Sequence, residues 1–410
     1  MAGTGGARHR RRFGGRPGRG GGRRGDDAMD GSAARRWRVG LVARIATVCT
    51  DERGGTRPID MAAIRWHQMS EALARLGHSV DILHGRYKWR LRQPVSALGP
   101  RLREVPLSRA RWDEYDVVKT LFHRGFETLE RFGGGDHPFL ISKLGSVVGP
   151  EDREGIYFYG RQRHALYRTQ ERIQATSRYI TLLTEPARAL WGECHGDRGN
   201  LLLVPGAAAA DIPGKGDDPY PRDPSGAARV LFAGSFYSTE RGSQAEAHRT
   251  LTDKLNALGR RLRDLGMWLY IIGTGEPASL DREAVRYLGA IPYRESWAYL
   301  HHADVGLVVS AGPFMHNNES TKIYHYLRVG LPVVSESGFP NDDLIRETGH
   351  GFLVEPGDLD ELCGTAKAAA QATWDRSGAM DYILRHHTWD KRAEVYDELL
   401  RRELPRNDTR

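Results

Sequence analysis

Short apolar segments that alternate with helical patterns constrain the fold of this chain more than any other feature. Residues 37–43 form an apolar run bounded by charge, which predicts a buried strand. Apolar residues then recur at helical spacing over residues 64–76, the pattern ends at Gly77, and residues 79–83 predict the next strand. A strand, a helix and a strand in this order imply a right-handed parallel crossover. The sequence therefore predicts an α/β fold.

The alternation continues in two series. Further strands are expected at 115–119, 138–142, 179–183 and 201–204 in the first series, and at 230–234, 268–273, 285–288, 305–309 and 332–335 in the second. A stretch rich in Pro, Gly and Asp over residues 208–228 predicts a linker between them. Two such series predict two Rossmann-like domains, over 37–207 and 229–385, that face a cleft. Ligands in such folds bind beyond the carboxyl ends of the strands.

The amino-terminal segment has a composition of its own. Residues 1–38 contain 11 Arg, 3 Asp and 11 of the 48 Gly, and neither Lys nor Glu. Without them, the chain's 60 basic and 52 acidic residues fall to 49 of each sign. Because this composition cannot bury enough apolar surface, we expect residues 1–36 to form a disordered tail.

Three interpretations of this tail stay open: contact with phosphates of RNA or lipid, no dedicated partner, or an upstream start ahead of Met29. No aromatic-rich RNA-binding motif follows it, so we expect no specific nucleic-acid partner.

Composition also narrows the class of protein. The chain has 410 residues and 3 Cys, without an apolar run of the roughly 20 residues that a membrane helix needs. It shows no secretory signal, so a cytoplasmic location is expected. Residues 86–92 interleave basic and aromatic side chains, which suits a solvated loop or peripheral contact with the inner face of a membrane.

One short helix carries most of the chemistry. A helix of about two turns is expected over residues 321–329. Ser320 or Thr321 suits its N-cap, Gly330 suits the position after its end, and Pro332 prevents continuation. The helix would lead directly into a buried strand.

The start of this helix suits an anion. Free amides and roughly half a positive charge at a helix N-terminus attract phosphate, and Lys322 in the first turn adds a cation. Thr321 and His325 share one face, so His325 is a candidate for a hydrogen bond to a ribose attached to the same phosphate. The alternative is a capped surface helix whose lysine is simply solvated.

An ordered set of segments resembles the GT-B glycosyltransferases, in particular the family 4-like, group 1 type. The similar segments of the second half are Val230–Phe236, Trp268–Gly275, Val285–Ile291, Ala303–Ser310, Lys322–Val334 and Gly351–Asp358, the last being similar to a closing turn. Gly54-Gly55 and Leu76–Val80 are similar in the first half. The resemblance spans residues 37–402 and implies that a helix within 386–402 crosses back to the first domain.

The resemblance implies a nucleotide-diphosphate sugar as donor substrate and no cofactor. The donor-binding residues that it implies are Gly54, Gly55, Ser235, Gly273, Leu288, Asn317, Ser320, Thr321 and His325. Two Glu residues are usual in the family at the positions of Asn317 and His325, and an Arg is usual at Ser235. These departures leave the sugar and the base of the donor open.

Transfer of a sugar from such a donor expels a diphosphate, whose charge must be stabilised. Lys322 and Arg241 are the candidates for this task, and no metal is expected because the Asp pairs suit solvated or capping positions. His123, after the strand at 115–119, is the candidate base for the acceptor, with Lys143 as an alternative. The acceptor is expected to be a glycan, a lipid-linked sugar or a small natural product. A catalytically inactive binding protein and a nucleotide-sugar epimerase of the same fold are the alternatives.

Overall fold

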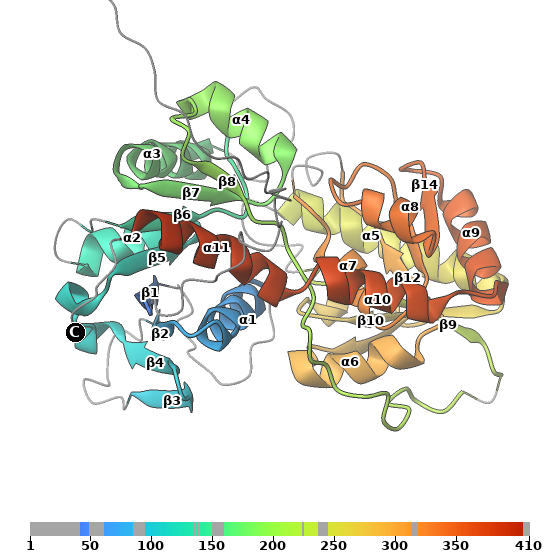
Figure 1. Cartoon of the computed structure of the whole chain (residues 1–410). Coiled ribbons are helices and arrows are strands. Elements are labelled where there is room, and N and C mark those ends of the chain that lie inside the picture. Colours follow the sequence, from blue (N-terminus) through green and yellow to red (C-terminus); the bar gives the residue numbers. More distant parts are fainter. Residues whose placement is uncertain are drawn as a thin grey trace, which may run out of the picture. The chain divides into compact units, whose positions relative to one another are not determined.

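The computed structural model describes residues 42–48, 61–84, 95–133, 137, 139–149, 160–223, 225–236, 245–312 and 318–404 (Figure 1). The chain divides into Met1–Gly40 and Leu41–Arg410, and all the described residues belong to the second unit. The predicted tail over residues 1–36 and the basic aromatic segment over 86–92 lie outside the described residues.

The first sheet contains eight strands in the order β3-β4-β2-β1-β5-β6-β7-β8, parallel except for the β3–β4 pair. These strands are β1 (Arg44–Val48), β2 (Ser79–His84), β3 (Ser96–Gly99), β4 (Leu102–Pro106), β5 (Val117–Leu121), β6 (Leu140–Lys143), β7 (Tyr179–Leu182) and β8 (Leu201–Leu203). Its helices are α1 (Met61–Arg75), α2 (Phe122–Phe132), α3 (Gly160–Thr176) and α4 (Glu185–His195).

Most of the first strand predicted over residues 37–43 lies outside the described residues, and its last two residues, Val42 and Ala43, precede β1, which begins at Arg44. Residues 45–48 are fully buried, and Arg44 is tolerated at the start because it forms an ion pair with Glu114 at 2.7 Å. Strands β3 and β4 were not predicted. The other expected strands and the helix ending before Gly77 are present, with shifts of a few residues.

The second sheet contains six parallel strands in the order β11-β10-β9-β12-β13-β14. They are β9 (Ala228–Ala233), β10 (Met267–Ile272), β11 (Val285–Gly289), β12 (Val305–Val308), β13 (Val333–Glu336) and β14 (Gly351–Val354). The helices are α5 (Ala245–Asp264), α6 (Tyr293–His302), α7 (Thr321–Arg328), α8 (Asp343–Thr348), α9 (Leu359–Gln371), α10 (Arg376–His386) and α11 (Trp389–Glu403). The segment expected as a closing turn thus begins with an edge strand, β14.

Both faces of each sheet are covered, which explains the continuous apolar strands. On the first sheet, α1 and α11 bury one face and α2, α3 and α4 the other. On the second, α6, α7 and α10 bury one face and α5 and α9 the other. Helix α11, the last of the chain, therefore belongs to the core of the first sheet, beside α1 (Figure 1).

Two connections run between the sheets, and they are paired with each other. The amide of Ala208 donates to the carbonyl of His387 at 2.9 Å, and the amide of Trp389 donates to the carbonyl of Ala208 at 3.1 Å. The Arg392 guanidinium also donates to the carbonyl of Gly206 at 3.0 Å. The chain therefore passes from one sheet to the other twice at a single, hydrogen-bonded place.

Candidate phosphate-binding site

The strand order of the second sheet indicates the edge at which folds of this kind bind ligands. From β9 the chain adds β10 and β11 on one side, and then β12, β13 and β14 on the other. Connections that leave β9 and β12 in opposite directions open a crevice at the carboxyl ends of these strands. Helix α7 follows β12, so its N-terminus lies at this edge.

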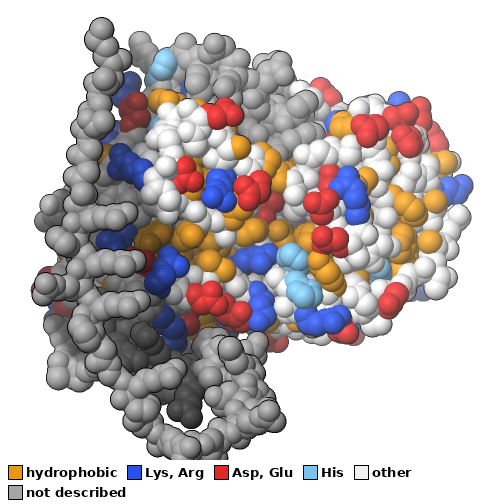
Figure 2. All heavy atoms as spheres, turned by 45° about the horizontal axis from the view of Figure 1, so that its top comes forward, with side chains coloured by type: hydrophobic (Ala, Val, Ile, Leu, Met, Phe, Trp, Pro, Cys, Tyr) orange, Lys and Arg blue, Asp and Glu red, His pale blue; other side chains and the backbone are white. Residues whose placement is uncertain are grey.

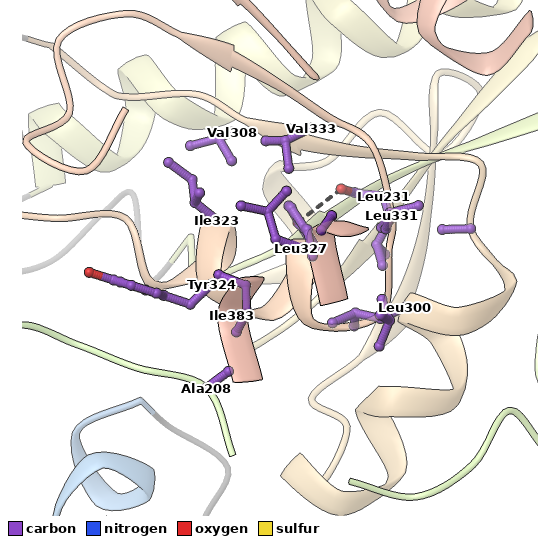
Figure 3. Close-up of a cluster of buried hydrophobic side chains, with 14 of the residues drawn as sticks. Ala208, Leu231, Leu300, Val308, Ile323, Tyr324, Leu327, Leu331, Val333 and Ile383 are labelled. Atoms are coloured by element: carbon purple, nitrogen blue, oxygen red, sulfur yellow. Dashed lines mark hydrogen bonds between the residues drawn. The ribbon is translucent and has the colours of Figure 1, made fainter. Parts of the chain in front are cut away.

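Apolar packing holds α7 in place. Ile323 and Leu327 of α7 lie beside Val308 of β12 and Val333 of β13 in one buried cluster (Figure 3). Gly330 follows the helix with a φ of 66°, a left-handed conformation that favours glycine. The apolar cluster and the tight turn at Gly330 therefore hold α7 in place, and with it the position of its N-terminus.

The helix start is not capped by a side chain. Ser320 occupies the N-cap position, as predicted, but its Oγ is buried without a hydrogen bond to any described residue. Asn341 instead clamps the Ser320 backbone, accepting from its amide at 2.8 Å and donating to its carbonyl at 2.9 Å. The first turn of α7 carries no acidic residue, so no carboxylate within the helix itself offsets its positive end.

Lys322 extends from this first turn toward the end of β9. Its Nζ lies 4.9 Å from the centroid of the Phe232 ring, and a Cβ placed on Gly234 would lie 2.6 Å from its Cε. Burial lowers the pKa of Lys322 to about 8. Among the described residues no carboxylate forms an ion pair with it.

Two glycine turns meet beside Lys322. The amide of Gly234 donates to Ile272 O at 2.9 Å, and Ser235 Oγ lies 3.0 Å from Thr274 Oγ1. Gly273 has a φ of 144°, and a Cβ there would lie 2.2 Å from the carbonyl oxygen of Gly234. Only glycine allows this close approach, so the loops after β9 and β10 form one packed rim.

His325 packs against helix α6. Its ring lies between Tyr293 and Trp297 of α6, with centroid distances of 5.6 and 5.2 Å. Its Nε2 is buried without a hydrogen-bond partner among the described residues. Burial, followed by the charges of Arg65 and Lys322, lowers its pKa to about 3, so the ring is neutral. A role toward ribose stays a prediction.

His123 belongs to a separate cluster in the first sheet. It is the second residue of α2 and follows Phe122, whose φ of 59° is unusual for a residue other than glycine. His123 Nε2 lies 3.1 Å from Gln170 Oε1, which also accepts from the amide of Val148 at 2.7 Å. This network assigns the proton to Nε2 and leaves Nδ1 as the basic nitrogen, while burial lowers the pKa of His123.

The remaining predicted residues are not brought to this rim by any described contact. Leu288 lies on β11 and lines a cavity of about 540 Å³ with Trp268, Arg286 and others. Lys143, the alternative base, donates from Nζ to the carbonyl of Val204. Gly54, Gly55, Arg241 and Asn317 lie outside the described residues.

The described part of the chain has neither a metal-ligand cluster nor a membrane-spanning helix. It contains no group of three or more His, Cys, Asp or Glu that could hold a metal ion. Among the same residues, no helix combines the length and apolar character needed to cross a bilayer.

Two charged residues at the start of α7, Arg65 and Glu319, were not predicted from the sequence. Arg65 of α1 donates from Nη2 to Thr321 Oγ1 at 2.6 Å, and it lies 3.5 Å from Glu319 Oε1. Glu319 Oε2 in turn accepts from the Tyr324 hydroxyl at 3.0 Å. No local pattern could reveal the first contact, because it joins residues 256 positions apart.

Known proteins share this architecture. Residues 227–371 match the family model described as Glycosyl transferases group 1. Similar structures include a sucrose-phosphate synthase from Thermosynechococcus elongatus, 14% identical, with a TM-score of 0.66 over 88% of this chain and 98% of that one. Another is Anabaena HepE in complex with UDP and glucose, 12% identical, with a TM-score of 0.58 over 88% of this chain and 100% of that one. No curated protein sequence matches the chain.

This chain therefore shares the GT-B fold of these structures, and residues 227–371 match a glycosyltransferase family model. Its second half carries the glycosyl transferases group 1 domain, which contains β9, β10, α7 and therefore Lys322.

Proposed function

We propose that this chain transfers a sugar from a nucleotide-diphosphate sugar to an acceptor hydroxyl, without a metal, and that the diphosphate binds at the N-terminus of α7. The observation that carries the proposal is the position of Lys322. Its side chain crosses the start of α7 and reaches the glycine rim after β9, without a carboxylate to neutralise it. A diphosphate supplies that missing charge.

The proposed reaction needs little covalent help from the protein. The bond between the anomeric carbon and the diphosphate oxygen breaks, and a bond from the acceptor oxygen to the same carbon forms. Negative charge grows on the departing diphosphate, where Lys322 and the first amides of α7 stabilise it. The acceptor proton goes to a base, for which His123 Nδ1 has the required lone pair.

Several observations support the donor class. The rim formed by Gly234, Ser235 and Gly273 lies beside Lys322, after the carboxyl ends of β9 and β10. The similar Anabaena structure contains UDP and glucose, and a similar E. coli structure contains UDP-2-fluoro glucose. A glycan, a lipid-linked sugar or a small natural product is the proposed acceptor, and the cytoplasm, including the inner membrane face, is the proposed location.

The test uses the full chain, a panel of nucleotide-diphosphate sugars and excess EDTA, with release of nucleoside diphosphate as the readout. We expect release with at least one donor and a loss of about a hundredfold in Lys322→Ala, by analogy with removal of an oxyanion donor. Lys367→Ala, on an exposed position of α9, is the matched control and should keep its activity.

Undiminished release in Lys322→Ala would remove the proposed role of this lysine. Donor binding without release would favour a catalytically inactive binding protein, and conversion of the donor sugar without an acceptor would favour an epimerase. Release of nucleoside diphosphate that occurs without EDTA and is lost when EDTA is added would contradict the proposed metal independence.

A further inference from the structure

Arg65 brings a second cation to the start of α7. It projects from α1, a helix of the first sheet, and its side chain is 14% exposed. Its Nη2 donates to Thr321 Oγ1 at 2.6 Å, and its Nε is buried without a hydrogen bond to any described residue. The guanidinium therefore has donor capacity left beside the first residue of α7.

The position is electrostatically unfavourable in the absence of an anion. A helix N-terminus carries about half a positive charge, so cations there are normally destabilising. Here Arg65 and Lys322 both lie at that end, and the first turn of α7 contains no acidic residue. Both cations also act on His325, whose pKa they lower in addition to burial.

One carboxylate lies beside Arg65, and it is already engaged. The Glu319 side chain is 2% exposed and lies 3.5 Å from Arg65 Nη2, which is longer than a direct hydrogen bond. Its other oxygen accepts from the Tyr324 hydroxyl at 3.0 Å. Glu319 thus orients the Arg65 guanidinium and offsets its positive charge. The positive charges of the helix N-terminus and of Lys322 have no carboxylate among the described residues to offset them.

We propose that Arg65 is a further phosphate-binding residue, supplied by the first sheet to a diphosphate bound at the start of α7, and that Glu319 positions it. This inference rests on the proposed function. The planar guanidinium suits two phosphate oxygens at once, which the lysine ammonium does not. The departing diphosphate is then held by residues of both sheets, Arg65 from the first and Lys322 from the second.

The test measures binding of inorganic pyrophosphate and of the nucleoside diphosphates UDP, GDP and ADP to the full chain by calorimetry. Arg65→Gln keeps a donor for Thr321 and removes the charge. We expect it to weaken binding about 10- to 100-fold, as for loss of a charged hydrogen bond, and to leave binding of the corresponding nucleoside unchanged. Arg65→Lys should recover part of the affinity.

Arg75→Met is the matched control. Arg75 lies on the same helix and forms an exposed ion pair with Asp390 at 2.7 Å, far along α1 from Arg65. We expect it to bind pyrophosphate as the unmodified chain does. The melting temperature of each ligand-free variant measures its stability separately. If Arg65 had only a structural role, Arg65→Gln would lower the melting temperature but would not change the affinity of the folded protein.

Equal affinity of Arg65→Gln and the unmodified chain for pyrophosphate and for every nucleoside diphosphate would overturn the inference and leave the proposed function standing. Equal losses for nucleoside and nucleoside diphosphate would also overturn it, because the effect would not depend on phosphate. If the unmodified chain bound none of these diphosphates, the proposed function would fail first.

Discussion

Lys322 is the residue on which the proposed donor site depends most. Its ammonium group is partly buried beside Phe232 and Gly234, and burial lowers its pKa to about 8. Near neutral pH the ammonium group is therefore still mostly protonated, but it loses its proton at a lower pH than an exposed lysine does. A bound diphosphate favours the charged form and raises this pKa again.

This linkage predicts the pH dependence of binding. Below about pH 8 the ammonium is charged before the ligand arrives, so affinity for a nucleoside diphosphate should be constant. Above it, the lysine must take up a proton on binding, and affinity should fall by up to about tenfold per pH unit. Lys322→Arg should lose this dependence, because an arginine stays charged throughout.

Calorimetry between about pH 7 and pH 9 at constant ionic strength measures this effect. An affinity of the unmodified chain that does not change over this range would contradict the lowered pKa of Lys322.

At the scale of the elements, the sequence predicts most of what local patterns encode. Helices α1 and α7 were expected because apolar spacing and terminal glycines act locally, and Gly330 follows α7 as predicted. The predicted first strand ended before β1 begins and β3 and β4 were missed, since pairing with strands elsewhere in the chain, such as β1 with β5 and β4 with β2, decides where short strands lie. The contact of Arg65 with Thr321 is also nonlocal, so no motif announces it.

The loop after β9 offers a prediction at this scale. In Gly234→Ala the new Cβ would lie 2.6 Å from Lys322 Cε and 2.9 Å from the Phe232 ring, so the lysine side chain must move. We expect a clear loss of nucleoside diphosphate affinity with a modest loss of stability, about 1 kcal/mol, because flexible side chains can yield. Calorimetry and thermal unfolding measure the two effects separately.

Gly192→Ala is the control for this variant. Gly192 lies within α4, and a Cβ there would meet nothing within 4 Å. It should leave affinity unchanged, and alanine should stabilise the helix slightly. A Gly234→Ala chain with full affinity would show that Lys322 does not need its present position.

At the scale of the whole molecule, residues 1–38 differ in net charge from the rest of the chain. The chain without residues 1–38 is formally neutral, with 49 basic and 49 acidic residues. Figure 2 shows acidic and basic side chains interspersed over the described part of the face that it displays. The net charge of +8 is therefore a property of the amino-terminal segment, and the proposed donor site relies on local cations, not on the overall field.

Deletion of residues 1–38 should accordingly leave release of nucleoside diphosphate unchanged. It should also remove most salt-sensitive binding to polyanions such as RNA or anionic vesicles, because the excess positive charge goes with it. Parallel assays of the full and shortened chains measure both effects. A large loss of sugar transfer on deletion would place part of the catalytic machinery in the tail.

A crystal structure of the full chain with a nucleoside diphosphate tests the central claim most directly. We predict phosphate oxygens within hydrogen-bond distance of Lys322 Nζ and of the first amides of α7, beside the Gly234 rim. A diphosphate bound elsewhere, for example in the cavity lined by Trp268 and Arg286 along β11, with the start of α7 unoccupied, would contradict it.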